Sequence, residues 1–90
     1  MATVRFTSAL RRFYPDLKEQ EVEAGTVKAL LDRLEAAYPG LKSYLVDERG
    51  RLRQHVNIYI GEELIADRET LADALEPGDE VLIFQALSGG

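Results

Sequence analysis

The sequence predicts an α+β domain in which a mixed sheet of four to five strands packs on one main helix. Apolar and polar residues alternate along residues 3–7 and 56–60, a pattern typical of half-buried strands. Apolar residues recur at helical spacing along residues 27–38, and a last apolar run occupies residues 81–87. A helix that connects a first pair of strands to later strands packs against one face of a mixed sheet, which gives the predicted architecture.

Length and composition fit a single small domain spanning residues 1–90. A hydrophobic fraction of 46% and a charged fraction of 30% are ordinary for globular proteins. A chain of this length buries only about 60% of the surface that it exposes when unfolded, so little room remains for a deep catalytic pocket. The formal charge of −5 disfavours binding to phosphate backbones, and we therefore expect no nucleic-acid partner.

Residue usage argues against several kinds of site. The sequence has no cysteine, which excludes disulfides, a thiolate nucleophile and cysteine-based zinc sites. Its single histidine, His55, leaves no pair of histidines to bind a metal ion. No long apolar run precedes the first charged residues, so we expect neither a signal peptide nor a membrane helix. The expected location is the cytoplasm, without a membrane partner.

The first strand is predicted at residues 3–7. Residues 8–16 contain a proline and two arginines and predict a turn. Residues 17–24 predict a weaker strand at the edge of the sheet. Leu17 and Val22 differ in parity, so we expect a bulge or bend in this strand.

The main helix is predicted to begin with Thr26 as its N-cap and to end before Pro39 and Gly40. Its apolar face consists of Val27, Leu30, Leu31, Leu34 and Tyr38. One apolar face of this length is enough to cover a small sheet.

Shorter elements follow the helix. In chain order we expect an irregular segment at 41–54 anchored by Leu41, Leu45, Val46 and Leu52, a strand at 56–60, a helical turn at 69–75, a turn at 77–80 and a last strand at 81–87. Six side chains are predicted to be buried between helix and sheet, namely Leu30, Leu34, Val56, Ile58, Val81 and Ile83.

This order of elements is that of the β-grasp, or ubiquitin-like, fold, and the sequence resembles the MoaD/ThiS family of ubiquitin-like sulfur carrier proteins. The resemblance covers essentially the whole chain. It rests on VRF at residues 4–6, TVKALLDRLEAAYPGL at 26–41, VNIYI at 56–60 and LEPGDEVLIFQALSGG at 75–90. The last block is the most specific, because it ends in Gly-Gly.

The C-terminal residues suggest how such a protein would work. We expect a flexible tail at about 86–90, in which Leu87 and Ser88 lead to Gly89 and Gly90. Glycine has no Cβ, so the two glycines fit a channel too narrow for side chains and leave the terminal carboxylate accessible. The resemblance implies that the Gly90 carboxylate is adenylated and then converted to a thiocarboxylate by sulfide or persulfide.

The nucleotide chemistry is expected to belong to a partner. Neither GxxxxGK nor GxGxxG occurs, so we expect no bound cofactor and an ATP-using partner. The resemblance implies two partners, an adenylating enzyme of the ubiquitin-activating type and a sulfur-accepting synthase subunit or biosynthetic enzyme. The chain itself would be a carrier or co-substrate and not an enzyme, or the small subunit of a sulfur-transfer complex.

The last strand also suggests a docking surface. If Val81 and Ile83 face the helix, then Leu82 and Phe84 face the opposite side, together with Tyr59 of the neighbouring strand. Apolar side chains on a sheet face without a helix favour partner docking.

Other polar residues are weaker candidates. His55 is expected to be a solvated or capping residue, because it has no nucleophile to serve. Arg49 to Arg53, together with Arg11 and Arg12, predict either solvated loops or a basic patch that contacts an acidic partner. The acidic residues at turns are expected to cap backbone amides, namely Glu62, Glu63, Asp79 and Glu80.

Three functions remain open from the sequence. The first is a sulfur carrier, the second is a modifier joined to lysines of other proteins, and the third is a β-grasp interaction module. For a carrier, the length and the 41–54 segment resemble the small subunit of molybdopterin synthase, which favours molybdopterin as the receiving pathway. The FQAL stretch before SGG departs from the proline-containing tail common in that group, and thiamine, cysteine and secondary metabolites remain alternatives.

Overall fold

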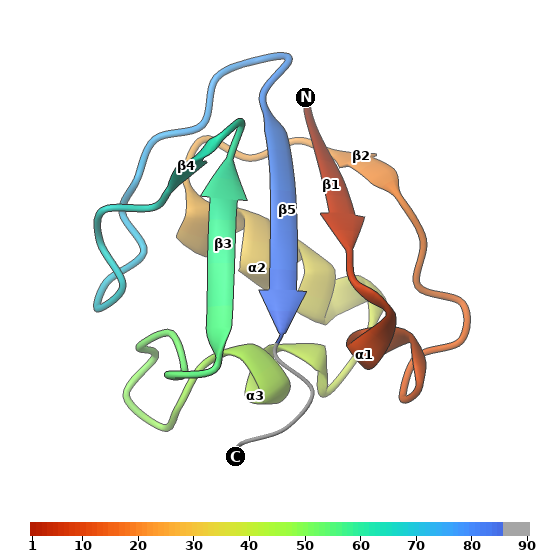
Figure 1. Cartoon of the computed structure of the whole chain (residues 1–90). Coiled ribbons are helices and arrows are strands. Elements are labelled where there is room, and N and C mark those ends of the chain that lie inside the picture. The colour runs from red at the N-terminus through yellow and green to blue at the C-terminus, as the bar shows by residue number, and fades with distance from the viewer. Residues whose placement is uncertain (86–90) are drawn as a thin grey trace.

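Five strands form one mixed sheet in the computed structural model, which describes residues 1–85 (Figure 1). The strands are β1 (Ala2–Phe6), β2 (Gln20–Val22), β3 (Val56–Ile60), β4 (Glu63–Leu64) and β5 (Glu80–Gln85). The helices are α1 (Ser8–Arg11), α2 (Val27–Ala37) and α3 (Leu41–Leu45). The order across the sheet is β2-β1-β5-β3-β4, so the last strand in sequence lies at its centre.

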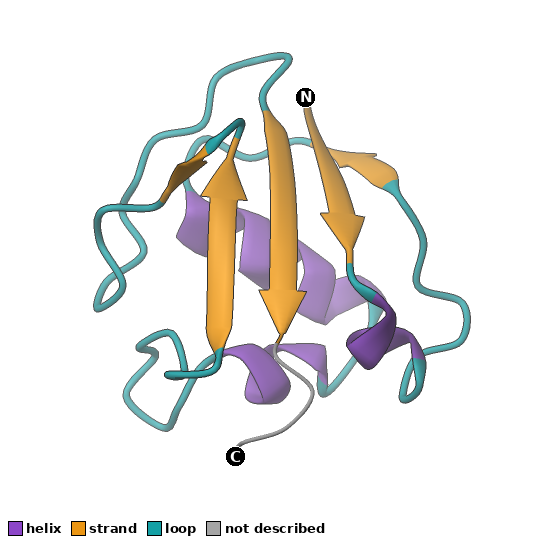
Figure 2. Cartoon of the chain, in the orientation of Figure 1, coloured by secondary structure: helices purple, strands orange, loops and turns teal. Residues whose placement is uncertain are grey.

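The sheet is mixed because β5 runs parallel to β1, whereas the other neighbouring pairs are antiparallel. The helix α2 crosses behind the sheet and covers one of its faces (Figure 2). This architecture confirms the predicted α+β class and the predicted β-grasp arrangement. No helix within residues 1–85 combines the length and the apolar character needed to cross a membrane.

The helix α2 begins as its sequence predicts. Thr26 has an extended backbone, and its side chain accepts a hydrogen bond from Ala29 N at 3.1 Å, which satisfies one of the free amides of the first turn. The helix ends at Ala37, and Gly40 has a φ of 94°, a left-handed conformation that glycine adopts without strain.

The core lies between α2 and the sheet. Within the described residues it contains the six side chains expected from the sequence, Leu30, Leu34, Val56, Ile58, Val81 and Ile83, and none of them exceeds 1% exposure. The four anchors predicted in the 41–54 segment, Leu41, Leu45, Val46 and Leu52, are buried as well. The predicted parities of the strands and the predicted face of the helix are therefore confirmed.

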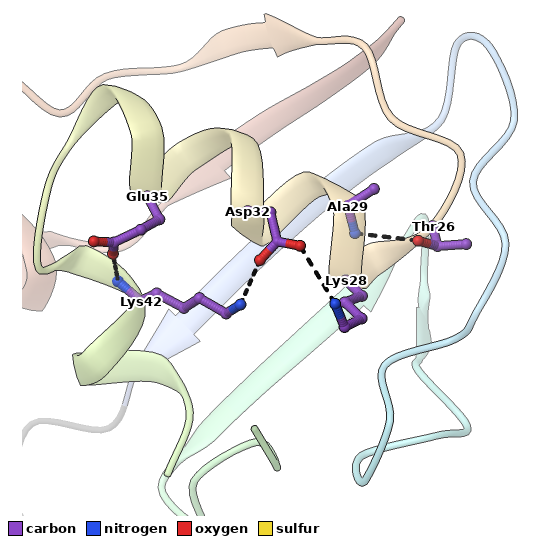
Figure 3. A network of polar contacts seen from close by, with 6 residues as sticks. All are labelled: Thr26, Lys28, Ala29, Asp32, Glu35 and Lys42. Carbon is purple, nitrogen blue, oxygen red and sulfur yellow. Dashed lines mark hydrogen bonds and ion pairs between the residues drawn. The ribbon is translucent and has the colours of Figure 1, made fainter. Parts of the chain in front are cut away.

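The segment after α2 is more ordered than expected. It begins with the short helix α3 and closes through an isolated bridge between Val46 and Leu52. Glu35 connects the two helices, because its carboxylate accepts the backbone N–H groups of Gly40 and Lys42, both at 2.8 Å. Figure 3 shows the bond from Lys42. These bonds hold the pKa of Glu35 below its usual value, with the Gly40 bond as the larger cause.

A second carboxylate reinforces this connection. Asp32 contacts the ammonium groups of both Lys42 and Lys28, the latter at 3.5 Å (Figure 3). The hydrogen bond from Lys42 is the main reason that the pKa of Asp32 lies below its ordinary value. The charged residues along this side of α2 therefore fix the position of α3.

Two further expectations for the first half were wrong. Residues 8–16 were expected to form a turn, but they begin with α1, which buries Ala9 and Leu10. The bulge or bend expected within a strand at 17–24 is absent from β2, which is shorter and pairs with β1 in continuous register. Leu17 lies before that strand, in a turn where its N–H donates to Tyr14 O at 2.9 Å, so its parity is independent of Val22.

The helical turn expected at 69–75 was also wrong. Asp67 accepts hydrogen bonds from the backbone N–H groups of Glu69, Thr70 and Ala72 and from the Thr70 hydroxyl. Asp73 in turn accepts from the N–H groups of Ala66 and Asp67, and Leu71 has a φ of 57°. The left-handed backbone of Leu71 interrupts the helical path, and the two aspartates hold the surrounding amides, so an Asp-centred turn forms instead of a helix.

Candidate functional site

The chain leaves the sheet from its central strand. Gln85 is the last described residue. There β5 still pairs with β3 through Val56, whereas its pairing with β1 ends at Ile83. The N–H of Gln85 donates to Thr7 Oγ1 at 3.4 Å, and its side-chain Nε2 lies 3.2 Å from His55 Nε2. Leu87, Ser88, Gly89 and Gly90 lie outside the described residues, so the roles predicted for them stay predictions.

The two parities of β5 separate as predicted. Val81 and Ile83 are buried against α2, whereas Leu82 is half-buried and Phe84 is 41% exposed. Figure 1 looks onto the face of the sheet opposite α2. Leu82 and Phe84 alternate with the buried Val81 and Ile83, so they belong to that face. We call this the open face.

Strand register brings the predicted docking residues together. Tyr59 of β3 is the direct partner of Leu82, and Asn57 is the direct partner of Phe84. Direct partners in an antiparallel pair project from the same face, so Tyr59, Leu82 and Phe84 form one apolar cluster. The structure thus places these three side chains together, while their role in docking stays a prediction.

Leu64 extends this cluster and was not among the predicted site residues. It lies in β4 opposite Tyr59 and is 54% exposed. The signal was available in the turn at Gly61, because a tight hairpin there returns the chain beside β3. We refer to Leu64, Tyr59, Leu82 and Phe84 as the apolar cluster of the open face.

Charged side chains border this cluster on the β1 side. Arg5 lies opposite Leu82 across the parallel pair, and its guanidinium contacts Glu19 at 3.0 Å and Glu80 at 3.5 Å. These groups are about half exposed, so the ion pairs are weak and exchange readily with other partners.

On the β3 side, Arg68 connects the open face to the loop that precedes β3. Its Nη1 donates to Asn57 Oδ1 at 3.1 Å, and its Nη2 donates to the carbonyl oxygens of Arg53 and Val56 at 2.7 and 2.8 Å. Arg68 was not recognised from the sequence, because its acceptors are distant in the chain.

Two basic residues of the 49–53 segment, Arg51 and Arg53, line an open depression of about 600 Å³. Its lining includes Arg51, Arg53, His55 and Arg68, together with the acidic Asp47 and Glu69. The predicted patch is not continuous with Arg11 and Arg12. Arg11 is the last residue of α1, and Arg12 follows it. In Figure 1, α1 and the 49–53 segment lie on opposite sides of the end of β5.

Asp47 organises the loop that carries these arginines. Its carboxylate accepts the N–H groups of Arg51 and Arg49 and also contacts Arg51 Nε at 3.1 Å. The bond from the Arg51 N–H is the largest reason that the pKa of Asp47 lies below its usual value. The loop is therefore held by its own acidic residue.

The remaining candidates do not form a catalytic arrangement within the described residues. His55 is exposed, and its imidazole contacts the Gln85 amide and no nucleophile there. Asp79 accepts the N–H of Glu76 at 2.8 Å, which confirms a capping role for that residue. Residues 1–85 contain no cluster of acidic or histidine side chains that could hold a metal ion.

Comparisons with known proteins agree with the geometry. The sequence model of the ThiS family matches residues 4–90. The sulfur carrier protein CysO of Mycobacterium tuberculosis is 34% identical over 90 residues, which cover 98% of this chain and 97% of that protein. Small archaeal modifier protein 3 of Haloferax volcanii is 35% identical over 65 residues, or 72% of this chain and 70% of that protein.

Solved structures give the same picture. The crystal structure of the Amycolatopsis orientalis BexX/CysO complex contains a chain that superimposes with a TM-score of 0.84 at 28% identity, with full coverage of both chains.

Proposed function

The chain belongs to the ThiS family, and we propose that it is a sulfur carrier protein whose Gly90 carboxylate is adenylated and then converted to a thiocarboxylate. The observation that supports this most strongly is the match to a sulfur carrier protein over nearly the full length of both chains. The family match also extends through residue 90, so it includes both glycines.

The proposed chemistry has two steps. The carboxylate of Gly90 attacks the α-phosphate of ATP, which releases pyrophosphate and leaves an acyl-adenylate. Sulfide then attacks the acyl carbon and expels AMP, so that one oxygen of the carboxylate is replaced by sulfur. Both steps belong to a partner of the adenylating type, which supplies the ATP site, and the carrier holds no cofactor of its own. The proposal places the chain in the cytoplasm, where this ATP is available.

The described fold supports such a role through rigidity. The strand β5 pairs with β1 up to Ile83 and with β3 up to Gln85, and the Gln85 N–H also donates to Thr7 Oγ1, so the strand is held to its last described residue. The apolar cluster of the open face lies on the same strand, and we propose that Phe84, Leu82 and Tyr59 dock on the adenylating enzyme. A partner bound there would hold the departing chain at a defined distance from its own active site.

The receiving pathway is a finer part of the proposal. The relatives that match over nearly the whole chain carry the name CysO and none of them is named as a molybdopterin-synthase subunit. We therefore favour cysteine synthesis among the pathways left open by the sequence, and molybdopterin gains no support from these relatives.

The experiment is a reconstitution with the adenylating enzyme of the same organism, ATP and sulfide, followed by intact-mass spectrometry. The expected product has the mass of the chain ending at Gly90 with one oxygen exchanged for sulfur. The matched control is the same chain without Gly90, which is expected to remain unchanged. An unmodified full-length chain, in the presence of an enzyme that is active on another carrier, would contradict the proposal.

A second function is favoured by one observation. Small archaeal modifier proteins 3 and 1 match at 35% and 37% identity over 65 residues, so conjugation to lysines is an alternative use of the same activated carboxylate. Mass spectrometry of the protein from its native host separates the two. Isopeptide-linked adducts would support the modifier, whereas a terminal thiocarboxylate without adducts would support the carrier.

A further inference from the structure

The depression beside the end of β5 carries cationic groups that the proposed chemistry does not use. Its arginines belong to a protein whose formal charge is −5, so they are a local departure from an acidic surface. The depression is also close to the point where the chain leaves the sheet, because His55 lines it and contacts Gln85.

Two of the arginines are oriented by internal hydrogen bonds that occupy only one of their nitrogens. Arg51 Nε donates to Asp47 Oδ2 at 3.1 Å, and Arg53 Nε donates to Ser43 O at 3.0 Å. Within residues 1–85, no hydrogen bond or ion pair uses the Nη atoms of either side chain. Each guanidinium is thus held at its base and presents its outer N–H groups to whatever occupies the depression.

Arg68 and Asp47 keep this arrangement in place. Arg68 donates to the carbonyl of Arg53, and Asp47 accepts the N–H of Arg51. Side chains that are already oriented lose less conformational entropy when they bind a ligand. The guanidinium groups of Arg51 and Arg53 are therefore suited to binding planar carboxylates.

The form of the site favours a protein segment over a phosphate group. The depression is open and about 600 Å³ in volume, and its lining includes the acidic Asp47 and Glu69 beside the arginines. These two carboxylates would repel a phosphate, which carries up to about two negative charges, more strongly than a side-chain carboxylate, which carries one. Single carboxylates that pair with individual arginines are therefore the better fit. The apolar cluster of the open face is adjacent, because Arg68 connects the depression to Asn57, the partner of Phe84.

We propose that Arg51 and Arg53 bind an acidic segment, carrying Asp or Glu side chains, of the adenylating partner while the apolar cluster docks beside it. This inference rests on the proposed function, since it concerns the same partner. The cationic depression would speed encounter and fix orientation, and the apolar cluster would supply affinity.

The test compares the double variant Arg51→Gln/Arg53→Gln with Arg33→Gln. Arg33 is exposed on α2, so the control removes a positive charge from a distant surface. Pyrophosphate release by the adenylating enzyme of the same organism is measured against carrier concentration. We expect the double variant to raise KM about tenfold with kcat unchanged, and to weaken the salt dependence of KM. The control is expected to stay within about twofold of the native protein.

Thermal unfolding of each variant separates docking from folding. If the double variant is destabilised, Arg51→Gln alone replaces it, because the Arg51 backbone bond to Asp47 remains in that variant. A KM for the arginine variants equal to that of Arg33→Gln would overturn the proposal while leaving the sulfur-carrier function intact.

A second measurement does not depend on the enzyme. The isotopically labelled chain is titrated with a capped oligoglutamate peptide and, separately, with inorganic phosphate and ATP, and backbone amide shifts are followed by NMR. Shifts at residues 51–55 with the peptide, absent in the double variant, are expected even if the native chain proves not to be adenylated. No shift with the peptide, or tighter saturation by phosphate or ATP at the same amides, would overturn the proposal.

Discussion

Phe84 and Ile83 are neighbours in β5 with opposite surroundings, since Ile83 is fully buried and Phe84 is 41% exposed. We expect Ile83→Ala to cost about 2–5 kcal/mol of unfolding free energy, because it leaves a cavity in the core. Phe84→Ala should change the melting temperature little and should weaken binding to the adenylating enzyme by about 2 kcal/mol or more, as aromatic anchors do.

Thermal unfolding and partner affinity measured on both variants check this prediction. Leu64→Ala is the matched control at the edge of the same cluster, where a smaller loss of affinity is expected. If Phe84→Ala unfolds the protein as readily as Ile83→Ala, the apolar cluster is part of the stable core and not a docking surface.

Gly89 gives a second prediction at this scale. Gly89→Val should impair adenylation, because a β-branched side chain restricts the backbone and obstructs a narrow channel. The melting temperature should stay that of the native protein, since the described core lies within residues 2–83. Pyrophosphate release and a melting curve measured on one preparation test both parts. Normal release by the valine variant would show that no narrow channel surrounds this residue.

At the scale of elements, the Asp-centred turn links stability to pH. Asp67 accepts hydrogen bonds from Thr70 and other groups of the turn, which lower its pKa to about 2. An ordinary aspartate has a pKa of about 3.9, so folding favours the ionised form. The stabilisation is therefore fully present above the unfolded pKa and is lost as pH falls through the folded one.

We expect chemical denaturation to show a loss of stability between about pH 5 and pH 2, part of which disappears in Asp67→Asn. The same experiment on Asp16→Asn, which changes an exposed carboxylate outside the turn, is the control. An acid slope in Asp67→Asn equal to that of the native protein would mean that other carboxylates dominate.

The elements also show where sequence patterns suffice. The helix α2 was predicted because its apolar residues recur at helical spacing over about three turns. The strands β1 and β3 were predicted from their alternating apolar residues, and β5 from its continuous apolar run. The helices α1 and α3 span only four and five residues, too few for a period of 3.6 to be distinguished from a turn. Residues 69–75 have good helical composition, but the left-handed φ of Leu71 interrupts a helix there, and Asp67 holds the turn through contacts that periodicity does not report.

The candidate site divides in the same way. Phe84 and Leu82 followed from strand parity, and Tyr59 from the expectation that its strand neighbours theirs, as the resemblance to the MoaD/ThiS family implies. Leu64 and Arg68 required knowledge of which strands pair and which loop crosses over them, because their partners are distant in sequence. The separation of Arg11 and Arg12 from the 49–53 segment is likewise a property of the folded topology and not of charge pattern.

For the whole molecule, the single layer of α2 carries much of the stability. Leu34 is 1% exposed within the core, and Leu34→Ala should cost about 2–5 kcal/mol, a large part of the stability of a small domain. Arg33→Ala, one position earlier and exposed, should stay within about 0.5 kcal/mol. Denaturant unfolding of the two variants measures the difference. Similar values for both would mean that α2 does not pack as described.

The central position of β5 has a consequence for how the protein is made. Every other described strand and helix precedes β5 in sequence, yet β1, the first strand, finds its parallel partner only in β5. During synthesis, the two halves of the sheet therefore remain unjoined until the final strand emerges. A chain that stops early lacks the middle of its sheet, whereas a finished chain acquires a stable fold and its terminal residues almost together. Under the function proposed above, a chain that has completed its sheet is therefore also one in which Gly90 has been or is about to be added.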